Sequence, residues 1–185
     1  MSTDTWRKHV TDLNTAMGQV EVAMQENHQR EQYFFTRGTN TVLTSMLEGY
    51  KRPVVLCAPM LGKHMVEMGR SVTILDIDDR FADVPGFQHW DLHRPVALEF
   101  EPDIIFCDPP FYTVKLDRLY RAITTLTQGN TQIPLMMSWI ARRQEALLGT
   151  FARYGLAETG YYPKYVSVAE TVHIQVYTNL RGSPP

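Results

Sequence analysis

Apolar and polar positions follow two different patterns along this chain. Over residues 1–30, apolar residues recur alternately four and three positions apart, which predicts an amphipathic helix. The apolar seam consists of Trp6, Val10, Leu13, Met17, Val20 and Met24. Such a seam either packs on the protein's own domain or pairs with a helix of another chain, and its length does not separate the two interpretations.

From Lys51 onward, apolar runs alternate with stretches of helical periodicity. The pattern predicts strands within 53–58, 71–77, 87–90, 102–107 and 133–140, and helices within 60–69, 116–126 and 141–151. Strands that alternate with helices indicate an α/β fold with a mostly parallel, doubly wound sheet. The middle strands are apolar throughout, which is typical of a sheet that is covered on both faces.

The last part of the chain returns to a period of two. Val166-Ser167-Val168 and the segment 172–176 have alternating apolar positions, which predicts antiparallel strands, a hairpin near an edge of the sheet. The final residues, 181–185, are predicted to be a disordered tail. The expected organisation is a helix over 1–30, one domain over 31–180 and the tail.

Charge and composition narrow the class of protein. The chain of 185 residues has a net charge of −2 and a pI near 6.3, whereas a domain that binds duplex nucleic acid by itself usually has a basic excess. This balance does not exclude a local basic rim or a basic partner. No signal or membrane-spanning segment is evident, and the two cysteines lie in apolar runs, so we expect reduced thiols, no metal site and an intracellular location (cytoplasm or nucleus).

Ligands of open α/β sheets bind beyond the carboxyl ends of the strands, so the residues that follow each strand are candidates for the site. The first strand runs into a turn at Ala58 and Pro59, which lacks a glycine-rich motif. The second ends at Asp76, where an acid commonly holds ribose hydroxyls. Asp91 follows the weak third strand and is placed to meet an adenine edge.

The most specific segment is Asp108-Pro109-Pro110-Phe111, directly after an apolar strand. Two prolines end the strand and stiffen the loop, which presents a carboxylate, a carbonyl and an aromatic face. Hydrogen bonds from a planar amine to the Asp108 side chain and the Pro109 carbonyl would expose the nitrogen lone pair. The loop therefore predicts an enzyme that methylates an amino group.

This loop matches the D/N-P-P-F/Y/W signature of amino methyltransferases that use S-adenosylmethionine. Three other segments strengthen the match: Gln32-Tyr33-Phe34-Phe35, Val55-Leu56-Cys57-Ala58-Pro59 and Leu75-Asp76-Ile77-Asp78-Asp79-Arg80-Phe81. Together they resemble the family of probable N6-adenine methyltransferases, which also includes elongation-factor lysine methyltransferases. The resemblance covers roughly residues 31 to 178, and it implies a Rossmann-like class I methyltransferase fold.

The resemblance also implies roles for individual residues. It places the target amine at Asp108, Pro109, Pro110 and Phe111, and the cofactor S-adenosylmethionine at Asp76 (ribose), Asp91 (adenine) and Gln32. We also expect Asp108 to contact the cofactor, and the turn at Ala58 and Pro59 to place helix amides near the cofactor carboxylate. Residues 32–35 would form a lid over cofactor and target, with the aromatics Tyr33, Phe34 and Phe35 supplying stacking. Apart from the resemblance, we expect Tyr112, Lys115 and Arg118 to contact the substrate. The spacing of Lys115, Arg118 and Arg121 fits either a solvated helix face or, for a nucleic-acid substrate, a set of phosphate contacts. Arg142 and Arg143 are additional candidates for phosphate contacts.

Three functions remain open at this level. The first is methylation of the exocyclic N6 amine of adenine in DNA or RNA. An adenine in a duplex would have to be flipped out of the helix to reach Asp108. The second is methylation of a protein lysine on the same fold. The third is a non-catalytic, methyltransferase-like scaffold subunit, which would associate with the same or another chain through its N-terminal helix.

Overall fold

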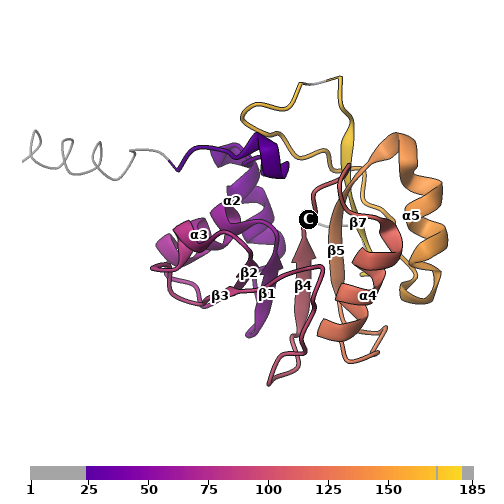
Figure 1. Cartoon of the computed structure of the whole chain (residues 1–185), viewed down its shortest axis with the longest axis horizontal. Helices are drawn as coiled ribbons and strands as arrows, with labels where there is room; N and C mark the ends of the chain where they lie inside the picture. The colour runs from indigo at the N-terminus through magenta and orange to yellow at the C-terminus, as the bar shows by residue number, and fades with distance from the viewer. Residues whose placement is uncertain (1–23, 170, 181–185) are drawn as a thin grey trace, which may run out of the picture.

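The computed structural model describes residues 24–169 and 171–180 of the chain, and within them seven strands form one sheet (Figure 1). The strand order is β3-β2-β1-β4-β5-β7-β6. The strands are β1 (Pro53–Leu56), β2 (Thr73–Asp76), β3 (Phe87–His89), β4 (Ile104–Cys107), β5 (Leu135–Ile140), β6 (Ala157–Glu158) and β7 (Ile174–Thr178).

The first five strands are parallel, and the last two are antiparallel to their neighbours. Strand β7 lies between β5 and β6, and all five of its residues are buried, so it is an interior strand. The predicted antiparallel position near an edge is confirmed, because β7 is second from the edge, beside the two-residue edge strand β6. From β1 the chain builds the sheet outward through β2 and β3, and it then crosses back to place β4 on the other side of β1. Strands β2 and β4 therefore flank β1, and their carboxyl ends lie at the same edge of the sheet.

Helices cover both faces of the sheet. Figure 1 shows α2 (Arg37–Met46) and α3 (Pro59–Glu67) on one side, and α4 (Leu116–Leu126) and α5 (Gln144–Thr150) on the other. Four short 3₁₀ turns complete the described elements: η1 (His28–Arg30), η2 (Asp79–Phe81), η3 (Ala141–Arg143) and η4 (Ala152–Tyr154). Because strands β1, β4 and β5 are buried throughout, their side chains form the core on both faces.

The predicted α/β class and the strand–helix alternation are confirmed, but the structure differs from the prediction in three segments. Helix α2 was not predicted. Residues 166–168 form no strand, and Val166 is 68% exposed, because the partner of β7 is β6. Residues 24–27 are not helical, and the rest of the seam predicted from Trp6 lies outside the described residues, as does the predicted tail.

Within the described ranges, no helix has both the length and the apolar character needed to cross a membrane.

Candidate active site

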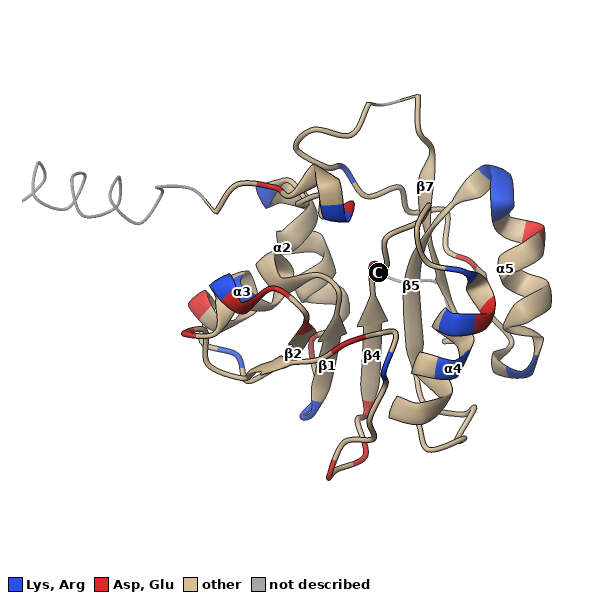
Figure 2. Ribbon diagram, in the orientation of Figure 1, with Lys and Arg blue, Asp and Glu red and all other residues tan. Residues whose placement is uncertain are grey.

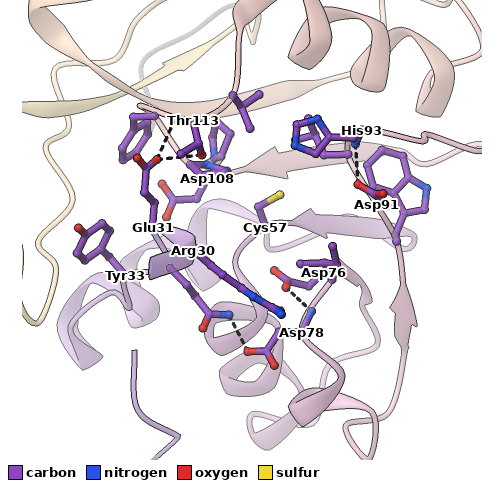
Figure 3. Close-up of a pocket in the computed structure, with 18 of the residues that line it drawn as sticks. Arg30, Glu31, Tyr33, Cys57, Asp76, Asp78, Asp91, His93, Asp108 and Thr113 are labelled. Atoms are coloured by element: carbon purple, nitrogen blue, oxygen red, sulfur yellow. Dashed lines mark hydrogen bonds between the residues drawn. The ribbon is translucent and has the colours of Figure 1, made fainter. Parts of the chain in front are cut away.

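The carboxyl ends of β1, β2 and β4 open onto one cavity of about 320 Å³. In Figure 3, Cys57 of the β1 turn, Asp76 of β2 and Asp108 after β4 point toward the same space. The segment 30–33 closes the cavity on the opposite side. The volume is near the lower end of the range for small-ligand sites.

The turn after β1 has the backbone shape of a glycine-rich nucleotide-binding turn, although it contains other residues at two of the three glycine positions. Cys57 has a φ of 58°, the left-handed conformation that glycine usually supplies in this turn. Pro59 occupies the first turn of α3, and a Cβ on Gly62 would lie 2.5 Å from Ile74 of β2. The spacing Cys57-x-Pro59-x-x-Gly62 therefore keeps the tight turn and the close helix–strand packing of a G-x-G-x-x-G motif. It omits the middle glycine, whose role is to admit a pyrophosphate.

Asp76, the last residue of β2, is a buried carboxylate beside the cavity. Its side chain is only 6% exposed, and Oδ1 accepts a hydrogen bond of 2.9 Å from the Asp78 backbone nitrogen. Burial raises the pKa of Asp76 to about 6, while the Asp78 amide and the charge of Arg30 act against this rise. Figure 3 shows the Arg30 side chain extending from η1 into the cavity toward Asp76.

Asp78, two residues further, serves the protein's own structure. It pairs with Arg80 at 2.6 Å and accepts a hydrogen bond of 2.9 Å from the Gln32 side chain. Burial opposes ionisation, but the hydrogen bonds from Arg80 and Gln32 lower the pKa of Asp78 below its usual value. Arg80 also donates to the Gln25 carbonyl and the Gln32 side chain, so this network ties the segment 25–32 to the end of β2.

Asp108 lies directly beyond β4 at the centre of the cavity wall. It is 8% exposed, and its Oδ1 accepts a hydrogen bond of 2.6 Å from the Tyr165 hydroxyl. Burial raises the pKa of Asp108 to about 7, and the hydroxyls of Tyr165 and Ser138 partly oppose the rise. The buried Ser138 hydroxyl lies beside this pair without meeting the geometry of a hydrogen bond with any described residue.

The loop after Asp108 is held in place by contacts with Trp139 and Arg143. The Phe111 ring packs edge-on against Trp139 of β5 at 5.8 Å. Arg143 lies over the Trp139 ring and donates a hydrogen bond of 2.8 Å to the Phe111 carbonyl. Arg143, a candidate phosphate contact by sequence, therefore braces the loop.

The segment before α2 is fastened to the same loop. One oxygen of Glu31 accepts hydrogen bonds from the backbone nitrogen of Tyr112 (3.0 Å) and from the backbone nitrogen and hydroxyl of Thr113 (3.2 and 3.3 Å). Figure 3 shows Glu31 beside Thr113. At the other end, Glu26 accepts from the backbone nitrogen of Phe34 at 2.8 Å and from the Ser167 hydroxyl. The segment 26–35 is thus anchored at two points, to the loop after Asp108 through Glu31 and to Ser167 through Glu26.

Comparison with known proteins decides the family. A family model described as probable N6-adenine methyltransferase matches residues 26–182, which is most of the chain. The chain belongs to this family. The resemblance noted in the sequence is thereby confirmed. A search of curated proteins found no match.

Solved structures show the same fold at low sequence identity. A putative RNA methyltransferase from Pyrococcus horikoshii has a TM-score of 0.56 and 14% identity, covering 91% of this chain and 96% of that one. A TehB-like S-adenosylmethionine-dependent methyltransferase from Corynebacterium glutamicum has a TM-score of 0.54 and 12% identity, covering 95% and 98%. The magnesium protoporphyrin IX methyltransferase of Synechocystis, solved with bound S-adenosylmethionine, has a TM-score of 0.53 and 13% identity, covering 76% and 78%. The chain has the class I methyltransferase fold that its sequence predicts.

The structure gathers about half of the residues that the sequence singled out. Eight of them line the cavity: Gln32, Tyr33, Asp76, Asp91, Asp108, Pro109, Pro110 and Phe111. The other candidates for cofactor and substrate contacts do not line it: Ala58, Pro59, Phe34, Phe35, Tyr112, Lys115 and Arg118. The candidate phosphate contacts Arg142 and Arg143 also lie outside its lining. Phe34 and Phe35 are buried at 7% and 4% exposure, whereas Tyr112, which follows Phe111, is 55% exposed. Figure 2 shows basic positions at the start of α4 and before α5, and acidic positions after β2.

Sequence reasoning missed several residues of the cavity. Arg30, Cys57, Trp90 and Tyr165 all line it. Cys57 and Trp90 adjoin strand ends that were already recognised, so their positions were signalled. Tyr165 lies 57 residues after Asp108 in an irregular loop, and no spacing or periodicity signals that the two meet.

Proposed function

We propose that this protein transfers a methyl group from S-adenosylmethionine to the exocyclic N6 amine of adenine in DNA or RNA. The observation that carries the proposal is the placement of Asp108, a buried carboxylate followed by Pro109-Pro110-Phe111, at the wall of a cavity that Asp76 also lines. One acid is available to a cofactor and the other to an amine. Membership of the probable N6-adenine methyltransferase family supports the same assignment.

The donor groups of the cavity fit S-adenosylmethionine. Asp76 at the end of β2 suits the ribose hydroxyls, and Asp91 at the end of β3 suits the adenine. Arg30 adds a cation that suits a carboxylate. Gln32 is bonded to Asp78 and Arg80, so it holds the lid segment as well as lining the cavity.

In this assignment the cofactor supplies an electrophilic methyl group, and the protein orients the amine. The ionised Asp108 accepts a hydrogen bond from the amine, and the Pro109 carbonyl is placed to accept the other. Both bonds draw the amine hydrogens to one side and direct its lone pair toward the cofactor part of the cavity. Phe111, held by Trp139 and Arg143, keeps the loop in place.

Aromatic residues in and beside the cavity define where a base would lie. Tyr33 and Phe111 line the cavity, and Tyr112 is exposed beside it. A flipped adenine would stack between such rings. Lys115 and Arg118 lie outside the cavity near the start of α4, so in this proposal they contact phosphates and not the base.

The test is methyl transfer from labelled S-adenosylmethionine to a mixture of DNA, RNA and protein, with Asp108→Asn as the inactive control. We expect label in nuclease-sensitive material as N6-methyladenine, lost in Asp108→Asn. If the wild type binds S-adenosylmethionine but never labels nucleic acid, the adenine assignment is wrong.

One observation favours a second substrate, a protein lysine. A lysine ammonium must lose a proton before it attacks, and a carboxylate whose pKa is raised to about 7 can accept that proton. Protease-sensitive label in the same experiment would select this function. A chain that does not bind S-adenosylmethionine at all would instead be a scaffold subunit.

A further inference from the structure

Tyr165 reaches the site from the loop between β6 and β7, far from Asp108 in sequence. Its hydroxyl donates a hydrogen bond of 2.6 Å to Asp108 Oδ1, and both side chains are buried with 8% of their surface exposed. We propose that Tyr165 is a positioning residue, which fixes the Asp108 carboxylate so that Oδ2 faces the target amine. The inference rests on the proposed function, because it assigns the two oxygens of Asp108 to different partners.

The position of Tyr165 is set by the lid segment. Phe35 and Tyr165 form an antiparallel bridge, and the flanking bonds are Thr36 nitrogen to the Lys164 carbonyl at 2.9 Å and Val166 nitrogen to the Phe34 carbonyl at 2.8 Å. The rings of Phe35 and Tyr165 pack 4.7 Å apart. The two phenylalanines proposed from sequence as stacking residues thus hold the tyrosine that reaches Asp108.

A second contact fixes this unit to the sheet. The Phe35 ring packs edge-on against Phe106 of β4 at 6.0 Å, two residues before Asp108. Tyr165 packs on Phe35, and Phe35 packs on Phe106 of β4. Strand β4 therefore positions both the Tyr165 phenol and the Asp108 carboxylate. Their relative position is therefore set by packing on both sides.

Asp108 needs such a partner because rotation about its terminal side-chain bond is weakly restricted. Of the described residues, Tyr165 is the one whose side chain forms a hydrogen bond with this carboxylate. Ser138 is close enough to affect both groups but completes no hydrogen bond with a described residue. Without the phenol, Oδ1 and Oδ2 would exchange freely and the amine would meet a poorly oriented acceptor.

The electrostatics of the pair favour the same arrangement. The Tyr165 hydroxyl lowers the pKa of Asp108, against the larger effect of burial. Burial and the Asp108 charge raise the pKa of Tyr165 well above its usual value, so the phenol keeps its proton and stays a donor. The other titratable groups beside Asp108 are the thiols of Cys57 and Cys107, whose pKa values burial also raises, and they remain neutral.

Tyr165→Phe tests the proposal because it removes the hydroxyl and keeps the ring that packs on Phe35. We expect kcat to fall about 10- to 100-fold, with the Kd of S-adenosylmethionine unchanged. The acid limb of the kcat/KM profile should also move to higher pH, because Asp108 loses a bond that favours its ionised form.

Tyr154→Phe is the matched control. Its buried hydroxyl bonds to Thr127 at 2.9 Å, and neither residue lines the cavity. We expect this variant to keep the wild-type kcat and pH profile. Equal melting temperatures of the two variants would show that lost stability does not explain a difference in turnover.

A measurement without substrate separates the inference from the proposed function. The pKa of the Asp108 carboxyl, followed by carbon NMR in the ligand-free protein, should be higher in Tyr165→Phe than in the wild type. An unchanged pKa would overturn the inference whatever the substrate is. A wild type that methylates nothing would instead count against the proposed function, while a raised pKa would still support the contact. An active Tyr165→Phe with the wild-type kcat and pH profile would overturn the positioning role alone.

Discussion

Two buried carboxylates, at the ends of the parallel strands β2 and β4 that flank β1, are held in different ways. Asp76 at the end of β2 is fixed by the backbone of its own turn, through the amide of Asp78. Asp108 beyond β4 is fixed by Tyr165, which lies 57 residues away. Burial raises the pKa of both, to about 6 and about 7 respectively.

The difference follows from what each end must do in the proposed reaction. A ribose diol is recognised in the ground state, and a local turn supplies enough rigidity for that. An acceptor for a reacting amine must be oriented more narrowly, and the protein uses a distant loop, the brace from Arg143 and the Glu31 contact to achieve it. Contacts close in sequence therefore fix the carboxylate at the end of β2, whereas contacts between distant parts of the chain fix the carboxylate beyond β4.

The largest effects should come from a matched pair of substitutions, each of which removes one of the two carboxylates. In Asp76→Asn and Asp108→Asn, the amide oxygen can keep the internal hydrogen bond while an N–H replaces the oxygen that faces the ligand. We expect Asp108→Asn to lower kcat about 100- to 1000-fold with little change in cofactor affinity. We expect Asp76→Asn to weaken S-adenosylmethionine binding about 10- to 100-fold. Calorimetry and single-turnover assays measure the two effects, and equal losses of both in either variant would contradict the division.

The pH dependence should separate the same two groups. Each carboxyl must be ionised to act, so activity is lost as pH falls through its folded-state pKa. With saturating cofactor, the rate should fall about tenfold per unit well below pH 7, the value for Asp108. Cofactor affinity should instead weaken below about pH 6, the value for Asp76. Asp108→Asn should lose the first transition and keep the second, and a binding transition that disappears in Asp108→Asn would contradict the assignment.

Stability should change with pH in the opposite direction. Both folded-state pKa values lie above 3.8, the usual value, so the folded protein binds more protons than the unfolded chain in this interval. The free energy of unfolding should therefore decrease as pH rises from about 4 toward 7, as far as these two groups are concerned. Urea denaturation of the wild type and of Asp108→Asn at several pH values measures this slope, which should be smaller in the variant.

Gly62→Ala should disturb the β2 end and leave the β4 end largely intact. A Cβ at this position would lie 2.5 Å from Ile74, two residues before Asp76. We expect the variant to be about 1–3 kcal/mol less stable to denaturant. Its cofactor affinity should fall more than its rate at saturating cofactor.

Gly149→Ala in α5 is the control for this substitution, because a Cβ there meets no atom within 4 Å. It should be neutral or slightly stabilising, by up to about 1 kcal/mol. If the two alanine variants have equal stabilities, the close packing of α3 on β2 does not matter.

The smallest effect is expected at the contact between Glu31 and the loop that follows Asp108. Glu31→Gln keeps an acceptor for the amides of Tyr112 and Thr113 but removes the charge. We expect kcat to fall about 2- to 10-fold, with cofactor affinity less affected. Glu48→Gln, at an exposed position outside the cavity, should behave as the wild type. If Glu31→Gln weakens cofactor binding more than it lowers kcat, Glu31 supports the cofactor side of the cavity near β2 and not the loop after Asp108.

The sequence predicted the sheet well where strands are apolar throughout, as in β1, β4 and β5, since such runs are buried in any arrangement. It failed where pairing partners decide the structure. The segment 166–168 alternates like a strand, but among the described residues it joins only the isolated bridge between Phe35 and Tyr165. The two-residue β6, in contrast, has no pattern of its own and pairs with β7. Helix α2 was also not recognised.

By itself, the sequence determined the α/β class, the family and the loop that carries Asp108, because strand runs and the Asp-Pro-Pro-Phe signature are local properties of the chain. Only the tertiary structure decided that Phe34 and Phe35 are buried, that Arg143 braces the loop and that Tyr165 meets Asp108. These contacts join residues that are far apart in the chain. Their formation depends on how loops cross the end of the sheet, and no periodicity encodes that.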